Sequence, residues 1–299
     1  MTPRHVVITF DYEGSWGMPQ PFDYDLAKTT DRLLELLDQA DAKAVFFVTA
    51  QLITEYPGVI QNIHRHGHEI GIHGLTHEHM HQLTAAGIAR FGAELSPILD
   101  QAEQLIGYRP RGFRAPYLMG PVFYDHRVYQ ALKDLGFTWI SNREIRMPEE
   151  LFLPGRLPFG LSLLRLRPLR RLALAALNTG IIRRERPVGG SWWSTIRWLW
   201  ANPVPFERPE GLIEYPLTSP LDCDLLGFPN PATPASAAAL NLAKYTLRAC
   251  FTASSAPFVV SCHDWISGTS NRSEVLQTIL KDVNETGNIR YFRPGIDPS

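Results

Sequence analysis

The sequence Val-Val-Ile-Thr-Phe-Asp-Tyr-Glu, residues 6–13, decides the fold class. Residues 6–10 are all β-branched or aromatic, which is typical of a buried strand. Asp11 and Glu13 follow at once, and α/β folds collect their active-site groups at the carboxyl ends of strands. Apolar residues at helical spacing then occupy residues 25–40. The stretch therefore predicts a strand, an acidic site and a helix in succession.

The rest of the chain repeats this order of short strand and longer helix. The expected strands are residues 6–10, 44–48, 69–72, 112–114, 138–141, 212–217 and 258–262. The expected helices are residues 25–40, 56–65, 84–107, 124–135, 235–249 and 273–283. Strands separated by helices of this length predict an α/β fold with a parallel sheet or barrel of βα units.

The composition is that of a globular protein with a sizeable core: 299 residues, 44% hydrophobic and 20% charged. A net charge of −1 gives no electrostatic reason to bind nucleic acid, so no such partner is expected. Three cysteines without close spacing do not predict a disulfide framework. The start of the chain lacks a signal pattern and no apolar run could span a bilayer, so the expected location is cytoplasmic.

Residues 150–210 interrupt the alternation and are expected to be an insertion in a single catalytic domain, residues 1–299. Residues 151–186 hold eight arginines, one acid and many leucines. This composition fits a surface helix on anionic lipid at the inner face of the membrane, or a lid packed on the barrel with solvated arginines. The four tryptophans between residues 192 and 200 could stack on a sugar ring or fill an interior.

Asp11 and Glu13 are two residues apart, so extended backbone would project both carboxylates to the same side. A carboxylate in such a place can be a metal ligand or a general base for water. Two solvated acids at a strand end would give the same pattern.

His73 and His77 are four residues apart, which on helical backbone would place both imidazoles on one face, able to bind one divalent cation. A polar, histidine-rich loop is the plainer interpretation of this region. His68 also fits a structural role before the strand at residues 69–72. The other neighbouring histidines are expected to belong to the loop: His64, His66, His79 and His81.

Arg114 and His263 each stand at the expected end of a strand. An arginine can hold and orient a carboxylate, and a histidine can act as a general acid, although either could be structural. Two acids, two histidines, an arginine and a distant histidine together meet the needs of a water-activating zinc site. Such sites typically use three protein ligands and keep an open position.

At these positions the sequence resembles the polysaccharide deacetylase family, also called the NodB-homology or carbohydrate esterase family 4 group. The resemblance spans nearly the whole chain and is densest over residues 5–142. The blocks that carry it are TFDYEG (9–14), AVFFV (44–48), GHEIGIHGLTH (67–77), GFRAPY (112–117) and VVSCHD (259–264).

The resemblance implies a distorted (β/α)7 barrel and one divalent metal ion, usually zinc, with cobalt, nickel or manganese as other options. By carry-over, His73 and His77 are metal ligands. The usual motif has two adjacent aspartates, whereas Tyr12 stands in the second position here. We assign Glu13 as the third ligand because its longer side chain can reach from a displaced position. Which of Asp11 and Glu13 is the ligand and which the base is left open.

The remaining roles also follow from the resemblance. Asp11 would be the base that activates water, and Arg114 would pair with it. The main-chain N–H of Tyr117 would help to hold the oxyanion. His263 would protonate the leaving amine.

The sequence departs from the family pattern a second time, in the group that would set the pKa of His263. The usual Asp-and-Trp motif after the fifth strand is not evident at residues 139–142, and Asp222 or Asp224 could substitute. The candidates for contact with substrate are Tyr12, Trp16, Pro116, Trp139, Asp222 and Asp224.

These residues predict metal-dependent hydrolysis of an amide C–N bond, with an N-acetyl or N-formyl amino sugar, lipid-linked or a small glycoside, as the favoured substrate. One alternative on the same fold is a cyclic imide or ureide hydrolase. The Asp-x-Glu variant favours it, and the large insertion disfavours it. A catalytically inactive, carbohydrate-binding barrel is the second alternative, against which the intact acid, imidazole and arginine positions argue. The acyl group, the metal and the oligomeric state stay open.

Overall fold

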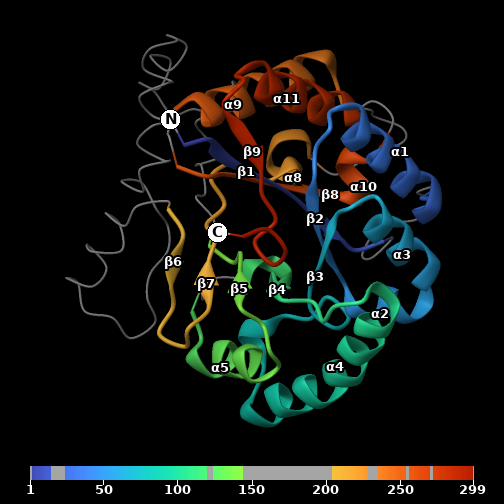
Figure 1. Cartoon of the computed structure of the whole chain (residues 1–299), viewed down its shortest axis with the longest axis vertical. Coiled ribbons are helices and arrows are strands. Elements are labelled where there is room, and N and C mark those ends of the chain that lie inside the picture. The colour runs from blue at the N-terminus through green and yellow to red at the C-terminus, as the bar shows by residue number, and fades with distance from the viewer. Residues whose placement is uncertain are drawn as a thin grey trace.

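The computed structural model describes residues 2–14, 24–119, 124–143, 204–227, 235–253, 256–269 and 272–298 (Figure 1). Residues 151–186 and 192–200 lie outside these ranges, so membrane contact and sugar stacking stay predictions. Among the described residues, none of the helices combines the length and the apolar composition needed to cross a bilayer.

A sheet of nine strands runs through the described part of the molecule. The strands are β1 (Arg4–Tyr12), β2 (Ala44–Val48), β3 (Glu69–Ile72), β4 (Gly112–Phe113), β5 (Trp139–Ile140), β6 (Phe206–Glu207), β7 (Ile213–Glu214), β8 (Phe258–His263) and β9 (Ile289–Tyr291). Their order is β6-β7-β5-β4-β3-β2-β1-β8, and β9 pairs with the start of β1. The neighbouring pairs are parallel except β6 with β7.

The two ends of this sheet approach each other. Beyond β7, the main-chain N–H of Thr218 donates to the carbonyl oxygen of Val259 in β8 at 3.0 Å, and the Thr218 hydroxyl accepts from the Val259 N–H at 2.8 Å. The parallel strands β1, β2, β3, β4, β5, β7 and β8 thus follow one another around a curled sheet. The expected distorted (β/α)7 barrel is confirmed for the described residues.

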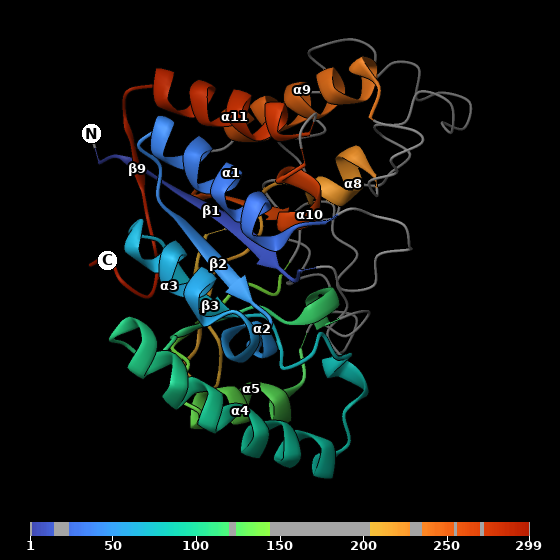
Figure 2. The same ribbon diagram turned by 90° about the vertical axis from the view of Figure 1, so that its right-hand side faces the viewer.

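Helices cover the outside of the sheet (Figure 2). They are α1 (Leu26–Gln39), α2 (Ala50–Glu55), α3 (Pro57–Arg65), α4 (Ala85–Ile106), α5 (His126–Asp134), α8 (Asp222–Leu226), α9 (Ala237–Ala253), α10 (Asp264–Ser267) and α11 (Ser273–Glu285), with 3-10 turns η1 (Met80–Gln82) and η2 (Pro116–Met119). Capping residues fix the ends of several helices. The side chains of Asp25 and Thr84 accept from main-chain N–H groups at the starts of α1 and α4. Gly107, with φ 80°, ends α4 in the left-handed region.

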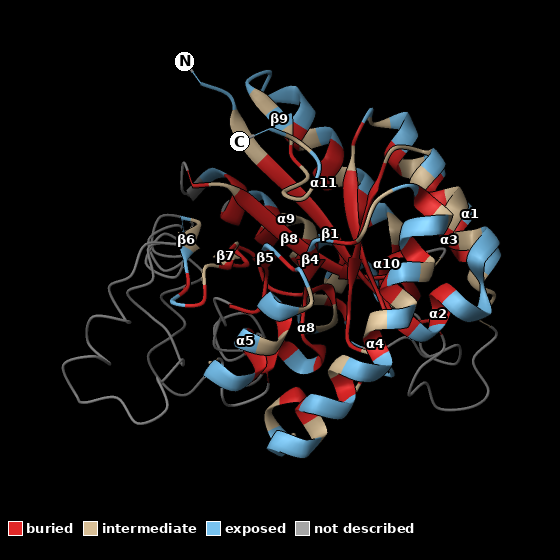
Figure 3. Cartoon of the chain, turned by 60° about the horizontal axis from the view of Figure 1, so that its bottom comes forward, coloured by how far each residue is buried: buried red, intermediate tan, exposed pale blue. Residues whose placement is uncertain are grey.

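Burial follows the barrel plan. Figure 3 shows buried residues along the strands and on the inward helix faces, with exposed residues on the outward faces. In β1 every residue from Val6 to Tyr12 is buried, as expected for a strand covered on both sides.

The amino ends of the strands are closed by the segment after β9. The Phe292 ring is buried and stacks on His5 with ring centroids 4.4 Å apart. The main-chain N–H of Gly295 donates to Glu69 Oε2 at 3.0 Å, and the Trp139 indole N–H donates to Glu69 Oε1 at 3.0 Å. The opposite end, where the strands finish, holds the candidate site.

Candidate active site

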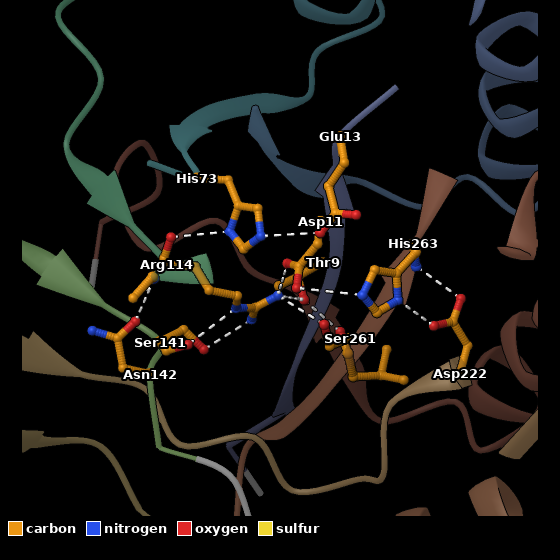
Figure 4. Close-up of polar contacts among 12 residues, drawn as sticks. Thr9, Asp11, Glu13, His73, Arg114, Ser141, Asn142, Asp222, Ser261 and His263 are labelled. Atoms are coloured by element: carbon orange, nitrogen blue, oxygen red, sulfur yellow. Dashed lines mark hydrogen bonds and ion pairs between the residues drawn. The ribbon is translucent and has the colours of Figure 1, made fainter. Parts of the chain in front are cut away.

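The carboxyl ends of β1, β3, β4 and β8 bring the predicted chemistry together. Asp11 in β1 pairs in register with His263 in β8. His73 follows β3 and Arg114 follows β4. The side chains that converge in Figure 4 include Asp11, Glu13, His73, Arg114 and His263.

Glu13, His73 and His77 form a buried cluster of ligand-type atoms. Glu13 Oε1 lies 3.2 Å from His73 Nε2 and 2.8 Å from His77 Nε2. The Nδ1 of His73 donates to the main-chain carbonyl of Arg114 at 3.0 Å. A neutral His73 therefore carries its proton on Nδ1 and turns the Nε2 lone pair toward the Glu13 carboxylate.

This cluster fits a divalent metal ion. A lone pair and a carboxylate oxygen repel each other, so the arrangement needs a cation, whether a proton or a metal. One carboxylate and two imidazoles suit zinc, and a hydrogen-bond partner on the far nitrogen is typical of a ligating histidine. Burial alone would raise the pKa of Glu13, but the contacts with the His73 and His77 imidazoles hold this pKa well below its usual range. The cluster thus offers an anionic ligand.

The backbone between the two histidines is a loop, so the helical condition for a shared face is not met. His77 has φ 66° and Gly74 has φ 73°, both in the left-handed region. A Cβ at position 74 would come within 2.8 Å of the Pro116 ring, so glycine allows the loop to pack closely there. Tertiary packing, rather than helical periodicity, brings the two imidazole centroids to 5.2 Å.

Arg114 is fully buried and anchors Asp11. Its Nη1 donates to Asp11 Oδ1 at 2.6 Å, to Thr9 Oγ1 at 2.8 Å and to Ser261 Oγ at 2.9 Å. Its Nε and Nη2 donate to the carbonyl and hydroxyl oxygens of Ser141 at 3.0 and 2.9 Å. A guanidinium held on several sides fixes both the position and the charge of its carboxylate partner.

Asp11 is an ionised carboxylate in these surroundings. Burial by itself would raise the pKa of Asp11, but the Arg114 guanidinium, followed by His73 and His263, lowers it below the ordinary value. Its other oxygen, Oδ2, lies 4.0 Å from His263 Nε2. A carboxylate and an imidazole therefore face each other across a short gap.

Asp222 is the partner of His263. His263 Nδ1 donates to Asp222 Oδ1 at 2.6 Å, and the main-chain N–H of His263 donates to Asp222 Oδ2 at 2.7 Å. Burial would lower the pKa of His263, but the Asp222 carboxylate raises it to about 10. Of the two aspartates suggested by the sequence, Asp222 is the one in contact, whereas Asp224 is exposed on α8.

The loop that carries Tyr117 has unusual backbone. Tyr117, Leu118 and Met119 have φ values between 50° and 66°, a region that residues other than glycine rarely adopt. Strained backbone of this kind often occurs at functional sites. The Tyr117 ring packs against His77 with centroids 4.8 Å apart and stacks on His79 at 4.1 Å. It is 39% exposed and forms part of the rim beside the metal-type cluster.

Two of the substrate-contact candidates point elsewhere and are corrected. Tyr12 alternates with Asp11 along β1, so its side chain faces the opposite side, is fully buried and meets the Thr30 hydroxyl at 2.5 Å. Trp139 is buried at the amino ends of the strands with Glu69, because its indole fills the barrel bottom. Pro116 is buried against the histidine loop, and Trp16 lies outside the described residues.

Other polar residues of the site were missed by sequence reasoning. The Trp265 indole N–H donates to Glu13 Oε2 at 2.8 Å, and Asp264 accepts from the Glu13 main-chain N–H at 3.1 Å. Their signal was the run His263-Asp264-Trp265, which could equally have been structural. Asn142 accepts from the Ala115 N–H at 2.7 Å and so supports the loop before Pro116.

The comparisons with known proteins relate the first half of the chain to the polysaccharide deacetylases. The polysaccharide deacetylase family model matches residues 1–140. A chitin deacetylase of Arthroderma benhamiae is 32% identical over 143 residues, 46% of this chain and 33% of that protein. A peptidoglycan-N-acetylglucosamine deacetylase of Bacillus cereus is 32% identical over 96 residues, 32% of this chain and 34% of that protein. The alignments span less than half the length of these relatives.

A solved structure agrees on the fold. A Mycobacterium smegmatis protein classed with the polysaccharide deacetylases superposes with a TM-score of 0.62 at 17% identity, over 97% of this chain and 87% of that chain. At this identity the likeness concerns the fold alone. The sequence relationship rests on residues 1–140, which hold Asp11, Glu13, both histidines and Arg114. Over these residues the predicted resemblance to the polysaccharide deacetylase family is confirmed.

Proposed function

We propose that this protein is a metal-dependent hydrolase that removes an N-acyl group, foremost acetyl, from an amino sugar. The observation that carries the proposal is the convergence of two imidazole nitrogens on Glu13 Oε1 beside the Asp11–Arg114 and His263–Asp222 pairs. This combination offers a cation site, a base and an acid within one buried cluster.

Glu13, His73 and His77 would hold the metal ion. When bound, a divalent metal supplies acidity to water and polarises an acyl carbonyl. The hydrogen bond from His73 Nδ1 to the Arg114 carbonyl keeps Nε2 free to be a ligand.

Asp11 would take the proton from the attacking water. The Arg114 guanidinium holds Asp11 Oδ1 and keeps the carboxylate ionised, while Oδ2 stays on the side of His263. General-base catalysis needs a group in this form and within hydrogen-bond reach of the water.

His263 would give its proton to the leaving nitrogen. Asp222 orients the ring through Nδ1 and favours the protonated form, so that Nε2 faces the reaction side with a proton to donate. As the new C–O bond forms and the C–N bond breaks, the products are a carboxylate and a free amine. The main-chain N–H of Tyr117 would stabilise the oxyanion between these steps.

The substrate class is inferred from the relatives. The named relatives are deacetylases of chitin and of peptidoglycan N-acetylglucosamine. We further propose that residues 1–299 form one catalytic domain.

The test is acetate release from N-acetyl-chito-oligosaccharides by the purified chain supplied with zinc, with His73→Ala as the matched control. Cyclic imides and ureides are assayed in parallel. The proposal requires metal-dependent acetate release that the variant lacks. Turnover of cyclic imides alone would favour the first alternative. Sugar binding without metal or turnover would favour an inactive barrel.

A further inference from the structure

The two carboxylate oxygens of Glu13 have different partners. Oε1 faces His73 and His77, as described above. Oε2 accepts from the Trp265 indole N–H at 2.8 Å, and both side chains are buried. The tryptophan therefore turns one oxygen away from the histidines.

The main chain at Glu13 is held as well. The N–H groups of Glu13 and Gly14 donate to Asp264 Oδ1 and Oδ2 at 3.1 and 3.2 Å. The Tyr24 hydroxyl donates to Asp264 Oδ2. Asp264 is fully buried, so its side chain has little room to move away from the Glu13 and Gly14 main chain.

From these contacts we propose that Trp265 and Asp264 are positioning residues that make Glu13 a metal ligand through Oε1 alone. The inference rests on the metal site of the proposed function. A carboxylate that binds through both oxygens takes two coordination positions, whereas a hydrolytic zinc site must keep a position open. An indole N–H on Oε2 disfavours the two-oxygen mode and fixes the carboxylate plane.

This role accounts for the displaced acid of the chain. A glutamate two residues after Asp11 has one more rotatable bond than an aspartate, so it needs additional contacts to stay in one orientation. The short helix α10 begins directly after His263. One short segment of chain therefore carries both the proposed proton donor, His263, and the residues that hold the proposed ligand, Glu13.

The test is Trp265→Phe, which keeps an aromatic ring and removes the indole N–H. Zinc affinity is measured by competition with a chromogenic chelator, and coordination by the visible absorption of the cobalt-substituted protein. The zinc Kd should rise about 10- to 100-fold, the usual effect of losing an outer-shell partner. The cobalt bands should weaken, as expected for a higher coordination number. Trp139→Phe is the matched control, because it removes an indole N–H from Glu69 at the other end of the barrel.

Unchanged zinc affinity and cobalt spectra in Trp265→Phe would overturn the inference. If that variant fails to fold, Tyr24→Phe replaces it: weaker zinc binding supports the positioning role, and an unchanged Kd contradicts it. A parent chain that binds zinc but releases no acetate contradicts only the proposed function. A parent chain that binds no zinc contradicts both.

Discussion

Each end of the barrel holds a buried glutamate that accepts from a tryptophan indole, and the two pairs have different surroundings. Glu13 accepts from Trp265 at 2.8 Å where the strands finish, and Glu69 accepts from Trp139 at 3.0 Å where they begin. The second oxygen of Glu69 accepts from the Gly295 main-chain N–H. The second oxygen of Glu13 faces two imidazole nitrogens instead.

A buried glutamate–tryptophan pair is therefore not by itself a functional site. Burial raises the pKa of Glu69 to about 8 in spite of its two hydrogen bonds. The histidines hold the pKa of Glu13 well below its usual range. The amino end is a closed, structural arrangement, whereas the carboxyl end presents ligand atoms that a cation can use.

The largest effect is expected when one of the two imidazoles beside Glu13 is removed, because the carboxyl end of the barrel then loses a ligand atom. His73→Ala deletes one of the two nitrogens beside Glu13 Oε1, so stoichiometric metal and turnover should both be abolished. Elemental analysis and acetate release measure the two effects. Full activity in a metal-free His73→Ala protein would contradict the metal site.

Asp11→Asn should separate the base from the metal ligand. The amide keeps the shape of Asp11 but cannot take a proton, so kcat should fall by about 10²- to 10⁴-fold while bound metal persists. Both are measured on the same purified sample. Loss of metal would mean that the roles of Asp11 and Glu13 are exchanged.

Asp222→Asn tests whether His263 is the general acid. The Asp222 carboxylate raises the pKa of His263 to about 10. Without this carboxylate the pKa falls, so His263 is deprotonated at a lower pH than in the parent protein. The alkaline limb of the kcat/KM profile should move to lower pH, with a loss of about ten-fold or more at pH 9. Asp224→Asn, on the same helix but exposed, is the control and should leave the limb in place.

Trp139→Phe should affect only the closed end. It leaves Glu69 Oε1 without its indole donor, which should lower the free energy of unfolding by about 1–3 kcal/mol. Urea denaturation measures this loss, and metal content should stay at the parent level. Loss of zinc together with stability would show that the two ends are coupled.

Much of the fold could be predicted from the sequence. All seven expected strands and six expected helices are present. Thr84 caps the start of α4 and Gly107 its end, which matches the helix expected over residues 84–107. The elements that were missed, α2, α8, α10, β6 and β9, are mostly too short to show a period of apolar residues. Seven parallel strands alternating with helices leave few topologies other than a barrel or a doubly wound sheet.

Only part of the candidate site could be predicted from the sequence. The residue types at positions 11, 13, 73, 77, 114 and 263 point to metal-dependent hydrolysis from the sequence alone. Tyr12 and Trp139 were placed wrongly near substrate because their neighbours in sequence are site residues. In a strand, adjacent side chains face opposite sides, and the strand's own ends lie at opposite ends of the barrel.

The sequence by itself determined the strand and helix order and the residue types at the strand ends, because both depend on local periodicity and composition. Tertiary structure alone decided that Asp222 partners His263, that Trp265 holds Glu13 and that a non-helical loop joins the two histidines. These contacts link residues up to 252 positions apart, and only the folded chain fixes which polar groups share one buried space.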